Sequence, residues 1–317
     1  MEKPLAISVV IPVFNEEANV DELHARLAGV LGDGVEFIFV DDGSSDKTCE
    51  RLEDIARADG RVRLIRFRRN FGQTAALSAG IDHARGRIIV PMDGDLQNDP
   101  KDIPRLLAKL DEGYDVVSGW RVNRKDPLQK RLPSMLANRM ISWISGVRLH
   151  DYGCSLKAYR RDVVKDVKLY GEMHRFVPIY ASWQGARVTE LPVDHHPRTR
   201  GKSNYGIERT VKVVLDLIVV KFLASYATKP IYVFGGFGLF SLMLAFLSFA
   251  WMLLFKLAPE PMHRDFVETP LPLFVVMLLL VGCLSLLLGL VAELTVRTYY
   301  ESQGKRTYLI REDGGGE

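Results

Sequence analysis

Residues 88–100 read I-I-V-P-M-D-G-D-L-Q-N-D-P, and the rest of the chain is organised around this stretch. Its apolar first half predicts a short buried strand that ends in the carboxylates Asp93 and Asp95. Side chains two apart in an extended chain point the same way, so Asp93, Asp95 and Gln97 are expected to present three oxygen groups to one side. Oxygen ligands suit Mg²⁺ or Mn²⁺, which keep positions open for water and for substrate phosphates. The pattern predicts a divalent cation that grips a diphosphate; the alternative is an ordinary polar turn before a helix.

Size, charge and cysteine content narrow the possible classes of protein. The chain has 317 residues, enough for one large or two modest domains. Its net charge of +3 does not indicate a general nucleic-acid binder. The three cysteines are scattered without a C-x-x-C pair, which indicates a reducing compartment and no structural disulfide. The N-terminus lacks the basic start and apolar core of a signal peptide.

Strand and helix patterns alternate along the first part of the chain. Strands are expected at residues 7–11, 36–40, 62–67, 88–92 and 116–120, and helices at 17–31, 47–58, 74–85 and 103–111. This alternation predicts an α/β, Rossmann-like, doubly wound sheet rich in parallel strands. Ligands of such sheets bind beyond the carboxyl ends of the strands. The polar side chains expected at that edge are Asn15, Asp41, Asp42, Asp93 and Asp95.

The pair Asp41 and Asp42 has two interpretations. Carboxylates at a strand end can accept hydrogen bonds from a ribose or from the N–H of a pyrimidine base. Alternatively, Ser44 and Ser45 cap the following helix and the acids complement its dipole. The chain contains neither G-x-G-x-x-G nor G-x-x-x-x-G-K-[ST], so dinucleotide-binding and P-loop chemistry are unsupported.

Four motifs occur in a characteristic order: V-V-I-P-V-F-N-E-E (9–17), V-D-D-G-S-S-D (40–46), R-N-F-G-Q (69–73) and D-G-D-L-Q-N-D-P (93–100). Together they resemble glycosyltransferase family 2 with the GT-A fold, and more narrowly its polyprenyl-phosphate glycosyltransferases. That group includes dolichyl-phosphate mannose synthase and the bacterial undecaprenyl-phosphate transferases for glucose and formamido-arabinose. The resemblance continues through D-Y-G-C-S-L-K-A-Y (151–159), R-G-K-S-N-Y (200–205) and two apolar spans. It implies inverting transfer of a sugar from a nucleotide-diphosphate donor to a polyprenyl phosphate, by a homo-oligomer (dimer or tetramer).

The resemblance also implies roles for individual residues. Asp41 or Asp42 would hold the base and ribose of the donor. The nucleotide pocket would be lined by Pro12, Asn15 and Glu16. The site for Mg²⁺ or Mn²⁺ would be formed by Asp93, Asp95 and Gln97, with Asp95 as the principal ligand.

Asp151 is placed near the anomeric carbon by the same resemblance, as a candidate general base. The chemistry tolerates a weak base, because a phosphate monoester has a second pKa of roughly 6 and is mostly dianionic at neutral pH. Asp151 is therefore expected either to take a proton, to orient the acceptor or to stabilise positive charge on the sugar. The plain alternative is an acid that caps a turn.

Basic residues occur in two stretches near the expected site. Arg121, Arg124 and Lys125 either meet phosphates or are solvated loop charges. A second stretch is expected to form an anion clamp for the donor diphosphate or the lipid phosphate, because arginine forks and a hydroxyl suit phosphate oxygens. Its members are His196, Arg198, Arg200, Lys202 and Ser203. The alternative is a basic stripe attracted to anionic lipid headgroups.

The second part of the chain is expected to be membrane-bound. Residues 207–228 show the spacing of an amphipathic interfacial helix. Residues 230–255 and 269–292 form uncharged runs of 26 and 24 residues, and a spanning helix needs about 20. Basic residues flank the outer ends of this hairpin, which places both termini and the catalytic domain on the cytoplasmic face of the inner membrane.

The expected organisation is a GT-A domain (1–206), the interfacial helix (207–228), two spans within 229–296 (about 230–255 and 270–292) and a tail (297–317). The tail carries a short strand at 307–311, a candidate oligomer contact.

Two other functions compete. A processive polysaccharide synthase would carry Q-x-x-R-W and more spans, whereas here Val188 follows Gln184-Gly185-Ala186-Arg187. A catalytically inactive membrane scaffold would be expected to have lost carboxylates that this chain retains. The stretch 151–159 resembles the bacterial undecaprenyl-phosphate transferases most closely, and this resemblance implies a UDP-sugar donor; GDP-mannose stays open.

Overall fold

The chain is described by a computed structural model that covers residues 6–122, 138–139, 141–143, 145–165, 173–197, 222, 229–259 and 262–302. It forms two compact units, Met1–Lys221 and Phe222–Glu317. The predicted domain boundary at 206, the predicted interfacial helix apart from Phe222, and the predicted strand at 307–311 lie outside the described residues.

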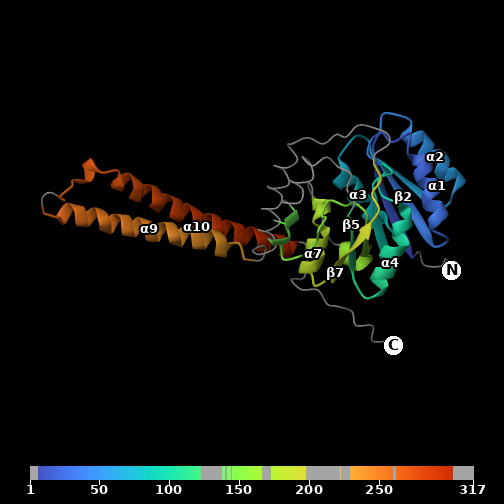
Figure 1. Cartoon of the computed structure of the whole chain (residues 1–317). Coiled ribbons are helices and arrows are strands. Elements are labelled where there is room, and N and C mark those ends of the chain that lie inside the picture. The colour runs from blue at the N-terminus through green and yellow to red at the C-terminus, as the bar shows by residue number, and fades with distance from the viewer. Residues whose placement is uncertain are drawn as a thin grey trace. The chain divides into compact units, whose positions relative to one another are not determined.

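The first unit is built on one seven-stranded sheet of order β3-β2-β1-β4-β6-β5-β7 (Figure 1). Its strands are β1 (Ile7–Val13), β2 (Val35–Asp41), β3 (Val62–Arg66), β4 (Ile88–Pro91), β5 (Val116–Arg121), β6 (Lys157–Arg160) and β7 (Val188–Val193). β6 pairs antiparallel with both β4 and β5, and every other pairing is parallel. The carboxyl ends of all strands except β6 therefore meet at one edge of the sheet.

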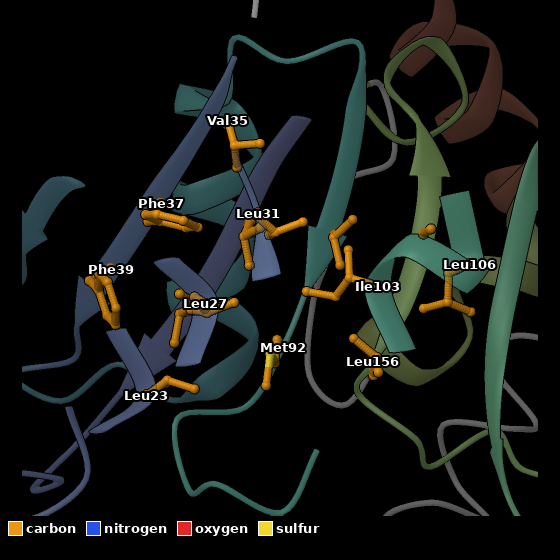
Figure 2. Packing of buried hydrophobic residues seen from close by; sticks show 14 of the residues in the cluster. Leu23, Leu27, Leu31, Val35, Phe37, Phe39, Met92, Ile103, Leu106 and Leu156 are labelled. Atoms are coloured by element: carbon orange, nitrogen blue, oxygen red, sulfur yellow. The ribbon is translucent and has the colours of Figure 1, made fainter. Parts of the chain in front are cut away.

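Helices cover both faces of this sheet because the strand side chains alternate between two cores. The helices are α1 (Val20–Val30), α2 (Thr48–Ala58), α3 (Gln73–His83), α4 (Ile103–Asp111), α6 (Arg161–Val164) and α7 (Val177–Trp183), with short 3₁₀ turns η1 (Pro100–Asp102) and η2 (Met173–Arg175). Val9 and Ile11 pack with side chains of α1, α2 and α4, and Figure 2 shows Leu23, Leu27 and Ile103 within this layer. Val10 packs on the other face with α3 and α7.

The predicted α/β fold is confirmed, with corrections at particular elements. The strands β6 and β7 were not expected, because the sequences K-A-Y-R and V-T-E-L-P-V carry charged residues and a proline. The first helix begins at Val20 and not at residue 17. Asn15 has a φ of 55°, and the N–H groups of Glu16 and Glu17 donate to side chains of Thr48 and Asp46 instead of entering a helix.

The second unit is a hairpin of two long helices, α9 (Ile231–Leu257) and α10 (Leu271–Ser302), joined by the turn η3 (Phe266–Glu268) (Figure 1). Both helices are long and apolar enough to cross a membrane. Large apolar side chains such as Phe246 and Leu280 point outward, whereas small residues lie where the helices touch. A Cβ added at Gly238 would lie 2.9 Å from the carbonyl oxygen of Gly282, so the two backbones approach closely there.

Candidate active site

The carboxyl end of β2 carries two buried acids, Asp41 and Asp42, which are 4% and 3% exposed. The carboxylate of Asp42 accepts the backbone N–H groups of Phe71 at 2.7 Å and of Gly72 at 2.9 Å. Asp41 Oδ1 accepts the N–H of Ser44 at 3.1 Å. Burial raises the pKa of Asp42 and outweighs these two N–H donors. The acids are thus bound to loops at the sheet edge. The alternative that Ser44 and Ser45 cap α2 is wrong, because Lys47 is the N-cap residue and both serine hydroxyls contact Asn15 instead.

The turn after β1 is tied to the turn after β2. The N–H of Asn15 donates to Ser44 Oγ at 2.9 Å, and Asn15 Oδ1 accepts the N–H of Ser45 at 2.8 Å. Asn19 Nδ2 donates to the carboxylate of Glu16. Pro12 lies inside β1, in register with Val40. Asn15 and Glu16 thus make structural contacts here, and their predicted contact with a nucleotide stays a prediction.

The D-x-D segment departs from the extended geometry that the sequence suggested. β4 ends at Pro91, the chain bends at residues 94–96, and Leu96 adopts a φ of 62°. The expectation that side chains at 93, 95 and 97 share one side of an extended strand is therefore wrong, because the alternation of sides ends with the strand. A Cβ on Gly94 would lie 2.7 Å from Val13 Cγ1, so the bend packs directly on the end of β1.

Each predicted metal ligand has an identified neighbour. Asp93 Oδ1 accepts a hydrogen bond of 2.7 Å from Gln73 Nε2. Asp95 Oδ1 accepts the N–H of Gln97 at 3.1 Å, and Gln97 Nε2 points to the carbonyl oxygen of His196 at 3.4 Å. The amide nitrogen of Gln97 is therefore engaged with the segment after β7.

The donor set suits a divalent cation that shares its coordination with a substrate. Among the described residues, no group of three or more His, Cys, Asp and Glu side chains is arranged to hold a metal ion. Two carboxylates on one tight bend are nevertheless what Mg²⁺ needs when substrate phosphates and water complete its shell. Asp93 and Asp95 fit such an ion, with Gln97 as a possible carbonyl ligand.

Arg121 and Asp151 form a buried ion pair where β5 ends. Arg121 Nε donates to Asp151 Oδ2 at 2.6 Å and Arg121 Nη2 donates to Oδ1 at 2.9 Å, with side chains only 14% and 4% exposed. Burial lowers the pKa of Arg121, but Asp151 outweighs burial and leaves that pKa above its ordinary value. The charge of Asp93 also reaches Arg121. Arg121 is therefore a buried partner of Asp151 and not a solvated loop charge.

The predicted anion clamp begins beside the D-x-D segment. The N–H of His196 donates to the carbonyl oxygen of Gln97 at 2.9 Å, and His196 Nε2 lies 3.2 Å from Asp99 Oδ2. Burial raises the pKa of Asp99, but the N–H of Lys101 and the nearby His196 bring it below its ordinary value. Arg198, Arg200, Lys202 and Ser203, like Arg124 and Lys125 of the loop after β5, lie outside the described residues.

Three polar residues near the site were not singled out from the sequence. Gln73 begins α3, Lys157 lies buried in β6 and His174 lies in η2. Burial lowers the pKa of Lys157 to about 8, and its Nζ donates to the carbonyl oxygen of Tyr152 at 3.2 Å. Gln73 closes the motif R-N-F-G-Q and Lys157 lies within D-Y-G-C-S-L-K-A-Y, and these motifs were the available signals. His174 lies in none of the quoted motifs, and its burial follows from the fold.

Cys154 is also buried, and burial raises the pKa of its thiol to about 11. A thiol with so high a pKa is a poor nucleophile.

The mostly parallel sheet with helices on both faces is an α/β fold of the GT-A type. The model of glycosyl transferase family 2 matches residues 8–168, and the chain belongs to that family.

Individual relatives narrow the comparison. The chain is 43% identical over 316 residues to dodecaprenyl-phosphate galacturonate synthase of Rhizobium johnstonii, covering 97% of this chain and 93% of the relative. It is 36% identical over 309 residues to undecaprenyl-phosphate 4-deoxy-4-formamido-L-arabinose transferase of Klebsiella pneumoniae, covering 96% and 92%. Both are similar over nearly the whole chain, including the helical hairpin.

Among solved structures, glucosyl-3-phosphoglycerate synthase from Mycobacterium tuberculosis has a similar fold. Its complex with Mn²⁺, uridine diphosphate and phosphoglyceric acid matches with a TM-score of 0.54 and 19% identity, covering 69% of this chain and 78% of that one. At this identity the match supports a similarity of fold and nothing about function.

Proposed function

We propose that this enzyme transfers a sugar from a nucleotide-diphosphate donor to the phosphate of a polyprenyl lipid, with inversion at the anomeric carbon. The observation that carries the proposal is the clustering at one sheet edge of Asp42, Asp93, Asp95 and the Arg121–Asp151 pair. The names of the relatives support a polyprenyl-phosphate acceptor. The hairpin supports a lipid partner, because it is apolar enough to lie in a membrane.

The reaction is a single displacement. An oxygen of the acceptor phosphate forms a bond to the anomeric carbon, while the bond from that carbon to the diphosphate breaks and a nucleoside diphosphate leaves. A bound Mg²⁺ or Mn²⁺ would supply charge stabilisation for the leaving diphosphate. Asp93 and Asp95 would hold that ion, Asp41 or Asp42 would hold the nucleoside, and the basic residues from Arg198 to Lys202 would meet phosphate oxygens.

The pairing of Asp151 favours an orienting role over proton abstraction. Both of its carboxylate oxygens accept hydrogen bonds from Arg121, and Oδ1 also accepts the N–H of Gly153 at 3.1 Å. An acceptor phosphate that is already dianionic has no proton to lose. Asp151 would instead fix the guanidinium of Arg121 and add negative charge close to the sugar.

The donor is proposed to be a UDP-sugar and the location the cytoplasmic face of the inner membrane. The names of the relatives above specify a galacturonate and a formamido-arabinose, so the donors in the test include sugars of both kinds. The test is a screen of UDP- and GDP-sugars with undecaprenyl phosphate in detergent, read by the mass of the lipid product. A product mass equal to the acceptor plus one glycosyl residue (the sugar less one water) is expected for one donor class.

The role of the metal is tested by Asp95→Ala and by a chelator. We expect turnover to fall by at least about a hundredfold in the variant, since a ligand to the ion is lost. Turnover that equals the parent's and ignores the chelator would remove the metal from the mechanism, while leaving the sugar transfer itself in place.

A further inference from the structure

The motif R-N-F-G-Q forms a loop, residues 69–73, that joins two acid motifs; we name it the tether loop. Its N–H groups at Phe71 and Gly72 bind Asp42 at the end of β2, and its last side chain, Gln73, binds Asp93 beyond the end of β4. β2 and β4 are not neighbours, because β1 lies between them. The tether loop therefore contacts two acids that follow strands on either side of β1.

The tether loop is held tightly on the β2 side. Gly43 has a φ of 72°, and a Cβ there would lie 2.5 Å from the carbonyl carbon of Arg69. Any larger residue at position 43 would clash with the backbone of Arg69 and Asn70. The loop therefore cannot slide relative to Asp42 without breaking this contact.

The α3 side is held by a neutral histidine. Thr74 Oγ1 lies 2.7 Å from His174 Nδ1, directly after Gln73 in the chain. Burial, together with the charges of Arg175 and Lys157, lowers the pKa of His174 to about 3. The imidazole is therefore uncharged at neutral pH, and it contacts the second residue of α3.

The carboxylate of Asp93 accepts a hydrogen bond from Gln73, and its charge also raises the pKa of Arg121. Gln73 is a neutral amide that occupies one carboxylate oxygen, Oδ1, without neutralising the charge. The side chain of Arg121 is 14% exposed and its guanidinium binds Asp151, and the negative charge of Asp93 helps to raise its pKa. A carboxylate released from Gln73 would be drawn toward this guanidinium, since charge-assisted hydrogen bonds are the stronger ones.

We propose that Gln73 is a positioning residue, whose side-chain amide holds Asp93 toward the cation and diphosphate and away from Arg121. This inference rests on the proposed function, because it assumes that Asp93 serves a divalent ion. Groups that orient a metal ligand without touching the metal typically contribute 10- to 100-fold in metal affinity. The expected effect of losing the Gln73 amide is therefore about tenfold weaker binding of Mn²⁺ in the presence of nucleoside diphosphate.

The experiment uses the full chain in detergent with the variants Gln73→Met and Gln73→Ala. Methionine keeps the length of glutamine but donates no hydrogen bond. Gln184→Met is the matched control, since Gln184 follows α7 and its structural contacts come from its backbone N–H. Mn²⁺ affinity is measured from the free-ion electron paramagnetic resonance signal, with UDP or GDP added, alongside binding of the same nucleotide without metal and the unfolding temperature.

Gln73→Met and Gln73→Ala are expected to weaken Mn²⁺ binding about tenfold, with metal-free nucleotide binding and unfolding temperature unchanged, and Gln184→Met is expected to match the parent. Mn²⁺ affinity equal to the parent's in Gln73→Met would overturn the inference. So would weakened nucleotide binding without metal, which would make Gln73 a donor contact, or a large fall in unfolding temperature, which would make its contact structural. If the parent does not bind Mn²⁺ with either nucleotide, the proposed role of a divalent cation in the reaction is wrong.

Discussion

At the scale of single residues, carboxylates in this protein serve two purposes, and Glu36 is an example of the structural kind. It is 3% exposed and accepts hydrogen bonds of 2.6 Å from Ser8 Oγ and from the N–H of Arg85. Arg63 Nη1 lies 3.0 Å from its second oxygen. Burial raises the pKa of Glu36, but these donors outweigh burial and bring the pKa below its ordinary value of 4.5.

This environment predicts a pH-dependent stability. A carboxyl whose folded pKa is lowered stabilises the fold fully above the unfolded value, and that contribution is lost as pH falls through the folded pKa. Glu36→Gln should therefore lower the unfolding free energy by about 2 kcal/mol at pH 7. The gap to the parent should narrow below about pH 4.5. Thermal unfolding in detergent at several pH values measures this, with the exposed Glu22→Gln as control; a gap independent of pH would contradict it.

Asp151 has a proposed role in the reaction, in contrast to Glu36. If it orients Arg121, Asp151→Asn should lower turnover about tenfold or more, because the buried guanidinium loses its counter-charge. The acid limb of the pH–rate profile should stay near pH 6, since it belongs to the acceptor phosphate. Turnover with undecaprenyl phosphate between pH 5 and 9 tests this. Disappearance of that limb in Asp151→Asn would instead assign Asp151 as the general base.

At the scale of elements, the helical hairpin depends on close approach of α9 and α10. Lipid removes the hydrophobic drive for helix association, so small residues and direct packing hold such pairs together. A Cβ on Gly238 would meet the carbonyl oxygen of Gly282 and Leu286 Cγ, each at 2.9 Å. Gly236, on the same helix, has nothing within 4 Å of its Cβ position.

Gly238→Leu should therefore separate the helices and destabilise the hairpin by about 1–3 kcal/mol, whereas Gly236→Leu should be tolerated. Protease resistance of the hairpin and unfolding temperature in detergent measure the difference. Equal behaviour of the two leucine variants would show that the contact at Gly238 contributes nothing to the hairpin.

At the scale of the whole molecule, the proposed topology places the catalytic unit and both termini in the cytoplasm. The turn between the spans carries Val267, which is 97% exposed, and α2 carries the exposed Arg57. In a chain whose native cysteines are replaced, Val267→Cys should react with an impermeant maleimide in intact cells. Arg57→Cys should react only after lysis. The reverse pattern would invert the topology.

A dimer or tetramer stays a prediction, which light scattering of the detergent complex can check.

Much of this molecule could be predicted from the sequence, because those features depend on local patterns. Burial of one helix face or of a whole strand shows in the spacing of apolar residues, so the strands from β1 to β5 were located correctly. The two uncharged runs coincide with the long apolar helices α9 and α10, although α10 continues to Ser302. The position of Asp41 and Asp93 at the carboxyl edge follows from parallel strands alone. Ordered motifs also indicated family 2, which the comparisons confirm.

Other features were decided only by the tertiary structure, because they join residues that are distant in the chain. The reversed strand β6 pairs with β4 and β5 although its own sequence is short and charged. The bidentate pairing of Arg121 with Asp151 and the contact of Gln73 with Asp93 join positions 30 and 20 residues apart. No local periodicity encodes such contacts. They form because the sheet brings strand ends together. At the low local dielectric, hydrogen bonds between the polar and charged groups that meet there are stronger than in water.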